Sequence, residues 1–136
     1  MLFRSVGFLY ATDFTAKKIF KVDVNAVTFS TIATGLAKTP NGIIYDGENN
    51  RCVYLTWGTN APINAIDLTT NAISTVLATT LSNCDGITRD TCGNYYGRGA
   101  REPLLASWRC DHVGRSQARH GTKLDYVKTA ADAGDN

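Results

Sequence analysis

The sequence contains no apolar run of the length that a membrane-spanning helix needs. Such a helix takes about 18 or more uninterrupted apolar residues, and nothing in the 136-residue chain approaches this, so no membrane span is expected. Residues 1–6 lack the long apolar run of a secretory signal and lead almost directly into a strand-like segment at Phe8. We therefore expect a chain that begins within a fold, without the signal of any longer parent protein. The compartment stays open; a soluble parent that is secreted or periplasmic is one alternative.

The cysteine spacing excludes a common class of metal site. None of the four cysteines forms a C-x-x-C pair, which argues against a zinc ribbon. Cys52 occupies a strand position and is expected to be a small core residue. Cys84 and Cys92 are close enough in sequence that a disulfide remains an alternative, so the redox compartment cannot be read from them. The sequence also lacks a phosphate-binding loop and a Ser-His-Asp arrangement.

Excess charge is missing from most of the chain. Residues 1–96 carry seven Lys/Arg and seven Asp/Glu, and residues 97–136 carry seven and five, so the net charge of +2 lies in the second segment. A nucleic-acid surface needs a concentrated basic patch. We therefore expect no nucleic-acid partner.

A repeat with a 44-residue period is the most informative feature that is present. Residues 8–34 and 52–78 align without a gap, and the matched pairs lie 44 positions apart: Tyr10 with Tyr54, Asp23 with Asp67, and Ile32 with Val76. A third copy opens where Asn41-Gly42-Ile43 recurs as Asp85-Gly86-Ile87. A period of about 40–45 residues, with four short β segments per unit, is typical of a propeller blade.

The repeat predicts an all-β fold, a partial β-propeller of about two and a half four-stranded antiparallel blades in an open arc. The β-branched runs support strands, and Asn- and Gly-rich clusters separate them. Residues 1–96 form the repeat region. Within it, 8–39 is a blade lacking its first strand, 40–83 is a complete blade, and 84–96 begins a third.

Residues 97–136 do not follow the period. Gly97-Arg98-Gly99 falls where the template has a strand centre, and glycines are poor strand formers. Our hypothesis is that this irregular tail results from a reading-frame shift or a fusion; a divergent polar or disordered tail is the alternative. A short helix around 102–108 is the one element expected there. Cys110, His112 and His120 are weaker metal-ligand candidates, because no framework surrounds them.

Two motifs carry a resemblance to a known family. Thr39–Ile43 opens one unit, and Asn83–Asp90 opens the next. They resemble the P-N-G-[IL] and P-D-G-[IM] blade starts of the senescence-marker-protein/gluconolactonase family, the regucalcin-like lactone hydrolases, with Cys84 where the family usually has Pro. The resemblance covers about residues 8–96. It implies a six-bladed parent with one divalent metal, most often calcium, in its channel.

The same resemblance implies roles for two residues. Asn41 and Asp85 match the family's metal ligands, and Asp85 also matches its general base, which would act on a lactone or ester substrate. Independently of the family, the residue before an innermost strand sits at the channel mouth, and amide and carboxylate oxygens suit calcium. The family's glutamate ligand comes from a blade that this chain lacks, so we expect the chain alone to be inactive.

The alternative is a non-catalytic propeller. Asn-Gly and Asp-Gly are strong turn formers whatever the function, and NHL-type propellers, which are binding modules, also place P-x-G-I before the innermost strand. Under this interpretation the parent is a secreted or surface protein that binds a protein ligand, and Asn41 and Asp85 only shape turns.

Overall fold

The computed structural model describes residues 2–5, 7–91, 93–99 and 103–106. Within them it contains β-strands and one short 3-10 helix, η1 (Gly47–Asn49), which confirms the all-β expectation. The strands are β1 (Leu2–Ser5), β2 (Phe8–Asp13), β3 (Lys18–Asp23), β4 (Thr28–Ala33), β5 (Thr39–Asp46), β6 (Arg51–Trp57), β7 (Ile63–Asp67), β8 (Ile73–Leu77), β9 (Asp85–Arg89), β10 (Tyr95–Arg98) and β11 (Pro103–Ala106). No helix in this described part is long and apolar enough to cross a membrane.

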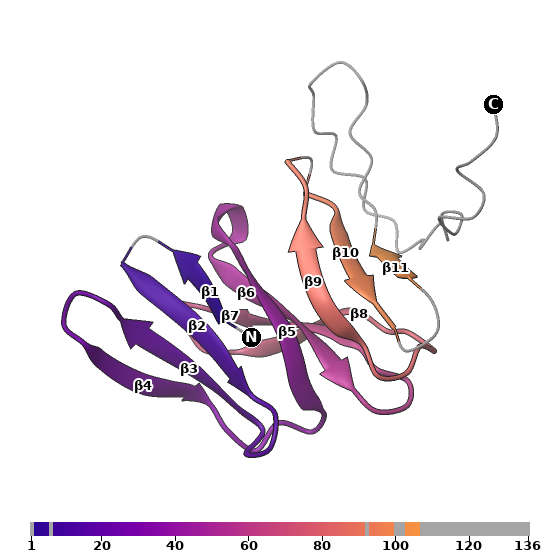
Figure 1. Cartoon of the computed structure of the whole chain (residues 1–136), viewed down its shortest axis with the longest axis horizontal. Helices are drawn as coiled ribbons and strands as arrows, with labels where there is room; N and C mark the ends of the chain where they lie inside the picture. Colours follow the sequence, from indigo (N-terminus) through magenta and orange to yellow (C-terminus); the bar gives the residue numbers. More distant parts are fainter. Residues whose placement is uncertain (1, 6, 92, 100–102, 107–136) are drawn as a thin grey trace.

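The strands form three antiparallel sheets that stand side by side (Figure 1). The first has the order β1-β2-β3-β4, the second β5-β6-β7-β8, and the third β11-β10-β9. The first strands of the sheets meet one another, since β5 contacts both β1 and β9. Each sheet then runs outward along the chain, as in propeller blades. Over the residues that the structure describes the arc is open, because its three sheets do not return to their starting point.

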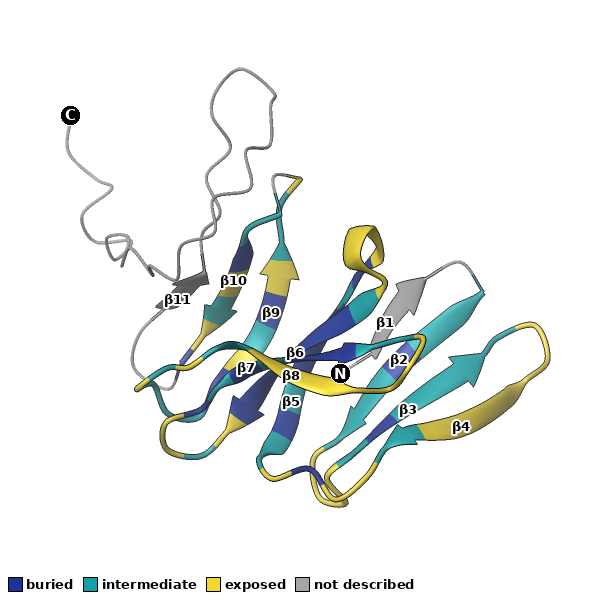
Figure 2. Ribbon diagram, turned by 180° about the vertical axis from the view of Figure 1, so that it is seen from behind, coloured by how far each residue is buried: buried dark blue, intermediate teal, exposed yellow. Residues whose placement is uncertain are grey.

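Two apolar clusters hold the sheets together, and Figure 2 shows the dark-blue core concentrated in the second sheet. One lies between the first and second sheets and includes Ile19, Ile43 and Ile66. The other lies between the second and third and includes Val53 and Ile63. All five are at most 1% exposed. Burying one such side chain contributes about 1.5–3 kcal/mol, so these seams are the main source of stability.

The first blade has the innermost strand that the sequence analysis did not expect. β1 pairs with β2, with Ser5 opposite Phe8, whereas in the second sheet Tyr45 lies opposite Cys52. The partners are therefore 3 residues apart in the first hairpin and 7 apart in the second. The shorter connection moves β1 four positions out of the 44-residue register, which is why the repeat did not show it.

The first blade also departs from the gap-free repeat by one residue. Phe8 pairs with Asp23, while its counterpart Cys52 pairs with Ile66, the counterpart of Val22 rather than of Asp23. A shift of one residue turns a strand's side chains to the opposite face. Tyr10 consequently packs toward the second sheet, into the same cluster that Tyr54 enters from the other side.

The third sheet extends beyond the predicted break. β10 runs through Gly97 to Arg98, with a register shift between these two residues, and β11 pairs with it. Pro103–Ala106 is a strand, so the expected helix around 102–108 is wrong over these residues, and 102, 107 and 108 lie outside the described residues. The frame-shift hypothesis for the rest of the tail, and the candidates Cys110, His112 and His120, also concern residues outside this part.

Candidate binding end of the propeller

Asn41 and Asp85 lie at the same end of neighbouring sheets. Asn41 is the third residue of β5 and Asp85 is the first of β9. The Asn41 side-chain amide donates a hydrogen bond to the Cys84 carbonyl at 3.3 Å, directly before Asp85. We call this end, where β5 and β9 begin and β2 and β6 finish, the entry end.

The two strand starts approach very closely through glycine. A Cβ on Gly42 would lie 3.1 Å from the backbone nitrogen of Gly86, which is tighter than ordinary contacts allow. Gly86 itself has a φ of 54°, in the left-handed region that glycine adopts without strain. The close approach of the two strands therefore explains the glycine at position 42, and the left-handed backbone explains the glycine at position 86, without any ligand.

The polar groups here make local bonds typical of turns. The exposed Asp85 carboxylate accepts a hydrogen bond at 2.8 Å from the amide of the next residue, Gly86. The Thr12 hydroxyl donates to the Asn41 backbone carbonyl at 2.6 Å, which ties the first sheet to the second. These bonds fit the turn interpretation and leave a ligand role for the two side chains untested.

A complete metal shell is not built into the described residues. Within them, no group of three or more His, Cys, Asp or Glu side chains comes together. Calcium takes six to eight oxygen ligands, so Asn41 and Asp85 would supply a small part of its shell. Their roles as metal ligands, and that of Asp85 as a general base, stay predictions.

An exposed aromatic pair at the entry end was missed by the sequence analysis. Trp57, opposite Thr39 at the end of β6, packs edge to face with Phe14, which follows β2. The ring centroids are 5.7 Å apart at 72°, and the two residues remain 38% and 47% exposed. The sequence did contain a signal for this pair. Phe14 follows the second strand of its blade and Trp57 ends the second strand of the next, and an aromatic residue that faces water at such a place has little to pack against.

A cation lies against the loop that follows Trp57. The Lys38 ammonium donates a hydrogen bond to the Thr59 carbonyl at 2.8 Å, in the loop after Trp57. The entry end thus combines two exposed rings, a fixed ammonium and the Asp85 carboxylate. Aromatic side chains with a polar rim are typical of protein-binding surfaces.

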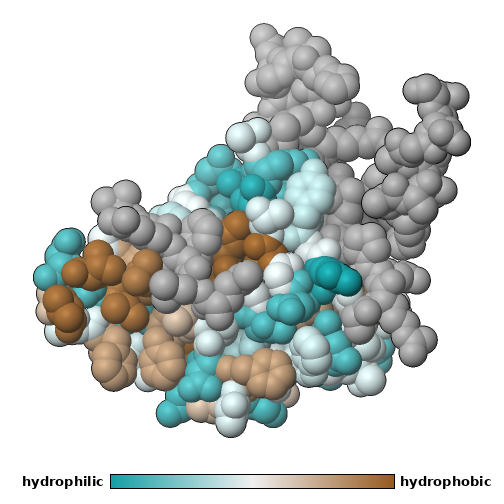
Figure 3. Space-filling model, in the orientation of Figure 1, coloured by the Kyte–Doolittle hydropathy of each residue, from teal (hydrophilic) through white to brown (hydrophobic). Residues whose placement is uncertain are grey.

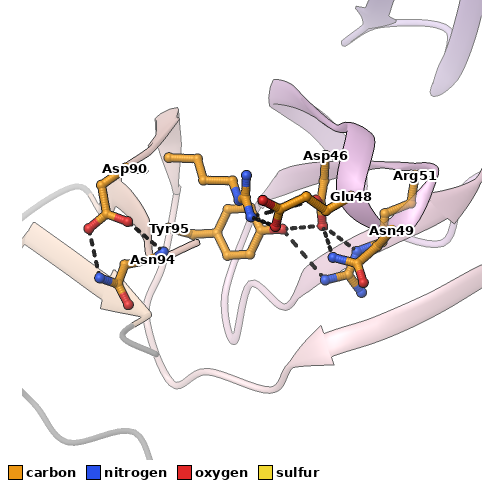
Figure 4. A network of polar contacts seen from close by, with 8 residues as sticks. Asp46, Glu48, Asn49, Arg51, Asp90, Asn94 and Tyr95 are labelled. Carbon is orange, nitrogen blue, oxygen red and sulfur yellow. Dashed lines mark hydrogen bonds and ion pairs between the residues drawn. The ribbon is translucent and has the colours of Figure 1, made fainter. Parts of the chain in front are cut away.

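The opposite end of the sheets carries a buried charged network, centred on Asp46 (Figure 4). The Asp46 carboxylate is 0% exposed and ends β5. Its Oδ2 accepts hydrogen bonds from Tyr95 Oη, Asn49 Nδ2 at 2.8 Å and Arg51 Nε at 2.9 Å. Its Oδ1 lies 3.9 Å from Arg89 on the third sheet. The sequence analysis gave none of these residues a role in a site.

The protonation of this network follows from its burial and its donors. Burial alone would raise the pKa of Asp46, but the hydrogen bonds from Tyr95, Arg51 and Asn49 outweigh it and hold the pKa below its ordinary value. Burial, followed by the bond to the Asp46 carboxylate, raises the pKa of Tyr95 to about 12. A charged carboxylate and a neutral phenol are therefore the stable pair.

The repeat reproduces part of this arrangement in the third blade. Asp90 lies 44 positions after Asp46 and accepts hydrogen bonds from the Asn94 backbone and side chain at 2.8 and 2.6 Å (Figure 4). It also accepts one from the Tyr96 hydroxyl at 2.8 Å. An aspartate that closes the innermost hairpin is thus a shared feature of the second and third blades.

Two of the cysteines are buried free thiols. Burial, and then the Asp46 charge, raises the pKa of Cys52 to about 12, which fits the predicted core role. Cys84 is also a free thiol, and Cys92 lies outside the described residues.

No protein-family model and no curated protein matches this sequence. Among solved structures, the chain is similar to one in a crystal structure of a nidogen/laminin complex, with a TM-score of 0.67 and 20% identity. The match covers 76% of this chain and 41% of that chain, so this chain spans less than half the length of its neighbour. At this identity the similarity shows the fold alone, which is propeller-like. The gluconolactonase resemblance stays a prediction.

Proposed function

We propose that the chain is a propeller module that binds a protein ligand at its entry end. The observation that carries this is the exposed Phe14–Trp57 pair. Aromatic side chains dominate the binding energy of protein interfaces, because they bury a large area with little loss of side-chain freedom. The neighbour in the nidogen/laminin complex belongs to a protein–protein assembly, which supports the same class of function.

The pair is already partly ordered for binding. The edge-to-face contact restrains both rings before any ligand arrives, so less side-chain entropy is lost on association. Lys38 and Asp85 add charges of opposite sign at the same end. A peptide with an apolar anchor and flanking charges fits this chemistry.

A displayed library of random twelve-residue peptides tests the proposal. We expect enriched peptides whose affinity falls about fivefold or more with Trp57→Ala or Phe14→Ala, since a buried interface aromatic is worth more than about 1 kcal/mol. Ile73→Ala is the matched control, because Ile73 is similarly exposed but lies on β8. Peptides that bind all four proteins equally, or no enrichment at all, would contradict the proposal.

A metal-dependent lactone or ester hydrolase of the gluconolactonase type is the second candidate. The contact of Asn41 with Cys84 favours it, because it brings Asn41 beside Asp85 at the expected channel mouth. A metal-held water next to a carboxylate can attack a lactone carbonyl. Calcium titration by calorimetry is the direct test: heat of binding with the natural chain, lost in Asp85→Asn and kept in Asp13→Asn, supports the site. No binding at millimolar calcium removes it.

A further inference from the structure

The outer face of the first sheet is apolar and uncovered by any part of the chain that the structure describes. Tyr10 and Ile19 face the second sheet, so the alternate residues face away. Cross-strand pairing places these alternate residues together, Leu9 opposite Val22 and Val22 opposite Phe29. Phe20 packs edge to face on Phe29, which is 73% exposed. We call Leu9, Phe20, Val22 and Phe29 the open flank; apolar side chains gather over β2–β4 in Figure 3.

The repeat shows what such a face contacts. Because β2 is shifted by one residue against β3, the second-sheet pair at the same place as Leu9 and Val22 is Cys52 and Ile66, which also lie opposite each other. Both are 0% exposed, because they pack against the preceding blade. Leu9 and Val22 remain partly exposed. The open flank therefore has the pattern of a surface that a preceding blade covers.

The other end of the arc carries the complementary face. On the third sheet, Ile87 and Tyr95 pack toward the second sheet, and the next residues, Thr88 and Tyr96, lie opposite each other and face away. Tyr96 is 39% exposed. The corresponding cross-strand pair in the second sheet, Ile44 and Val53, is buried against the third blade. We call Thr88 and Tyr96 the far flank.

We propose that two copies of this chain associate flank to flank, the open flank of each on the far flank of the other. The three sheets of the described residues do not close, whereas propellers close with about four to eight blades. Each chain carries both halves of one blade–blade contact. A two-fold axis along the channel repeats that contact, so two chains complete a six-sheet ring without leaving either flank exposed. Such a ring has two contacts, which makes it more stable than a single apolar patch would predict.

The test is the mass of the 136-residue chain by sedimentation equilibrium, with one variant on each flank. The natural chain of 14.7 kDa should sediment as a dimer, and Val22→Asp and Tyr96→Asp should each shift it to monomer. Phe29→Asp is the second open-flank variant, because its side chain is largely exposed and its loss does not threaten folding. Ile73→Asp, on the β8 edge, is the control and should remain a dimer.

Mixing the two flank variants separates this arrangement from its alternatives. Phe29→Asp and Tyr96→Asp chains together retain one unaltered contact, so an equimolar mixture should form a one-to-one dimer that neither variant forms alone. If the apolar flanks instead paired with each other, Tyr96→Asp would stay dimeric, and the proposal would be wrong. The proposal would also be wrong if the natural chain stayed monomeric at a concentration about 100 times a dissociation constant of about 1 μM. An open-ended polymer in place of a dimer would overturn it as well.

Discussion

The Tyr95 hydroxyl donates a hydrogen bond to the buried Asp46 carboxylate and so joins the third sheet to the second. Arg89, the cross-strand partner of Tyr95, approaches the same carboxylate, and it also pairs with Glu48 on η1. Charged groups of both signs are therefore shared across this seam. Removing one donor leaves the carboxylate buried with fewer partners, which costs more than losing an exposed bond.

Replacing Tyr95 with Phe should lower the free energy of unfolding by about 1–3 kcal/mol, because a buried charged acceptor loses one donor. Urea denaturation followed by circular dichroism measures this. Tyr96→Phe is the matched control: its hydroxyl bonds to Asp90 at an exposed site, and a change within about 0.5 kcal/mol is expected. Equal effects of the two variants would mean that the Asp46 bond has no special weight.

Stability should fall in acid because of Asp46. Its folded pKa lies below the ordinary 3.8, so its contribution is present above that pH and is lost as the pH falls through the folded value. Urea midpoints measured from pH 6 down to pH 2 should therefore drop, and the drop should be smaller in Asp46→Asn, which starts from a lower midpoint. Parallel curves for the two proteins would assign the acid sensitivity to other carboxylates.

Val27 is strained in its turn, and relieving the strain should stabilise the chain. Its φ is 52° although it is β-branched, and it is 86% exposed. The repeat places Asn71, with a φ of 59°, at the same position. Val27→Asn should raise the free energy of unfolding by about 1 kcal/mol, since the left-handed region costs about 1–3 kcal/mol for unsuited residues. The reverse change, Asn71→Val, should lower it by a similar amount in the same thermal melts.

A methyl group at Gly42 should disturb the approach of β5 to β9. Its Cβ would lie 3.1 Å from backbone nitrogens of both Gly86 and Ile87, and backbone cannot rotate away. We expect Gly42→Ala to cost about 1–3 kcal/mol, as overpacking does, and to increase amide exchange at Ile87. Unchanged exchange there would show that the sheets adjust without separating.

The repeat was enough to predict the blade architecture and the entry-end placement of Asn41 and Asp85. It failed where connections differ in length. β1 escaped notice because its hairpin is shorter, and the opposite facing of Tyr10 and Tyr54 depends on a one-residue shift in pairing. Neither change alters the hydrophobic pattern within a strand, so pattern analysis cannot detect it.

The Asp46 network was equally hidden, for a different reason. Asp46, Arg51 and Arg89 each resemble ordinary strand-end charges in the sequence, and only packing of the two sheets buries them together. The Phe14–Trp57 pair, by contrast, had a visible signal in two aromatics beside turns. The 44-residue repeat predicts the features that recur in each blade. Contacts between different residues of neighbouring blades are seen only in the structure.

The contact between the first and second sheets and the contact between the second and third sheets rely on different interactions. We call them the first and second seams, and we expect them to respond differently to salt and acid. The first seam relies on the stacked rings of Tyr10 and Tyr45 and on apolar packing, which salt strengthens slightly or leaves alone. The second adds ion pairs: salt screens the exposed Arg89–Glu48 pair, and acid neutralises the carboxylates. Under rising ionic strength or falling pH, the contact between the second and third sheets should therefore weaken more than the contact between the first and second. A chain built from repeated units thus has one seam that is more sensitive to salt and acid than the other.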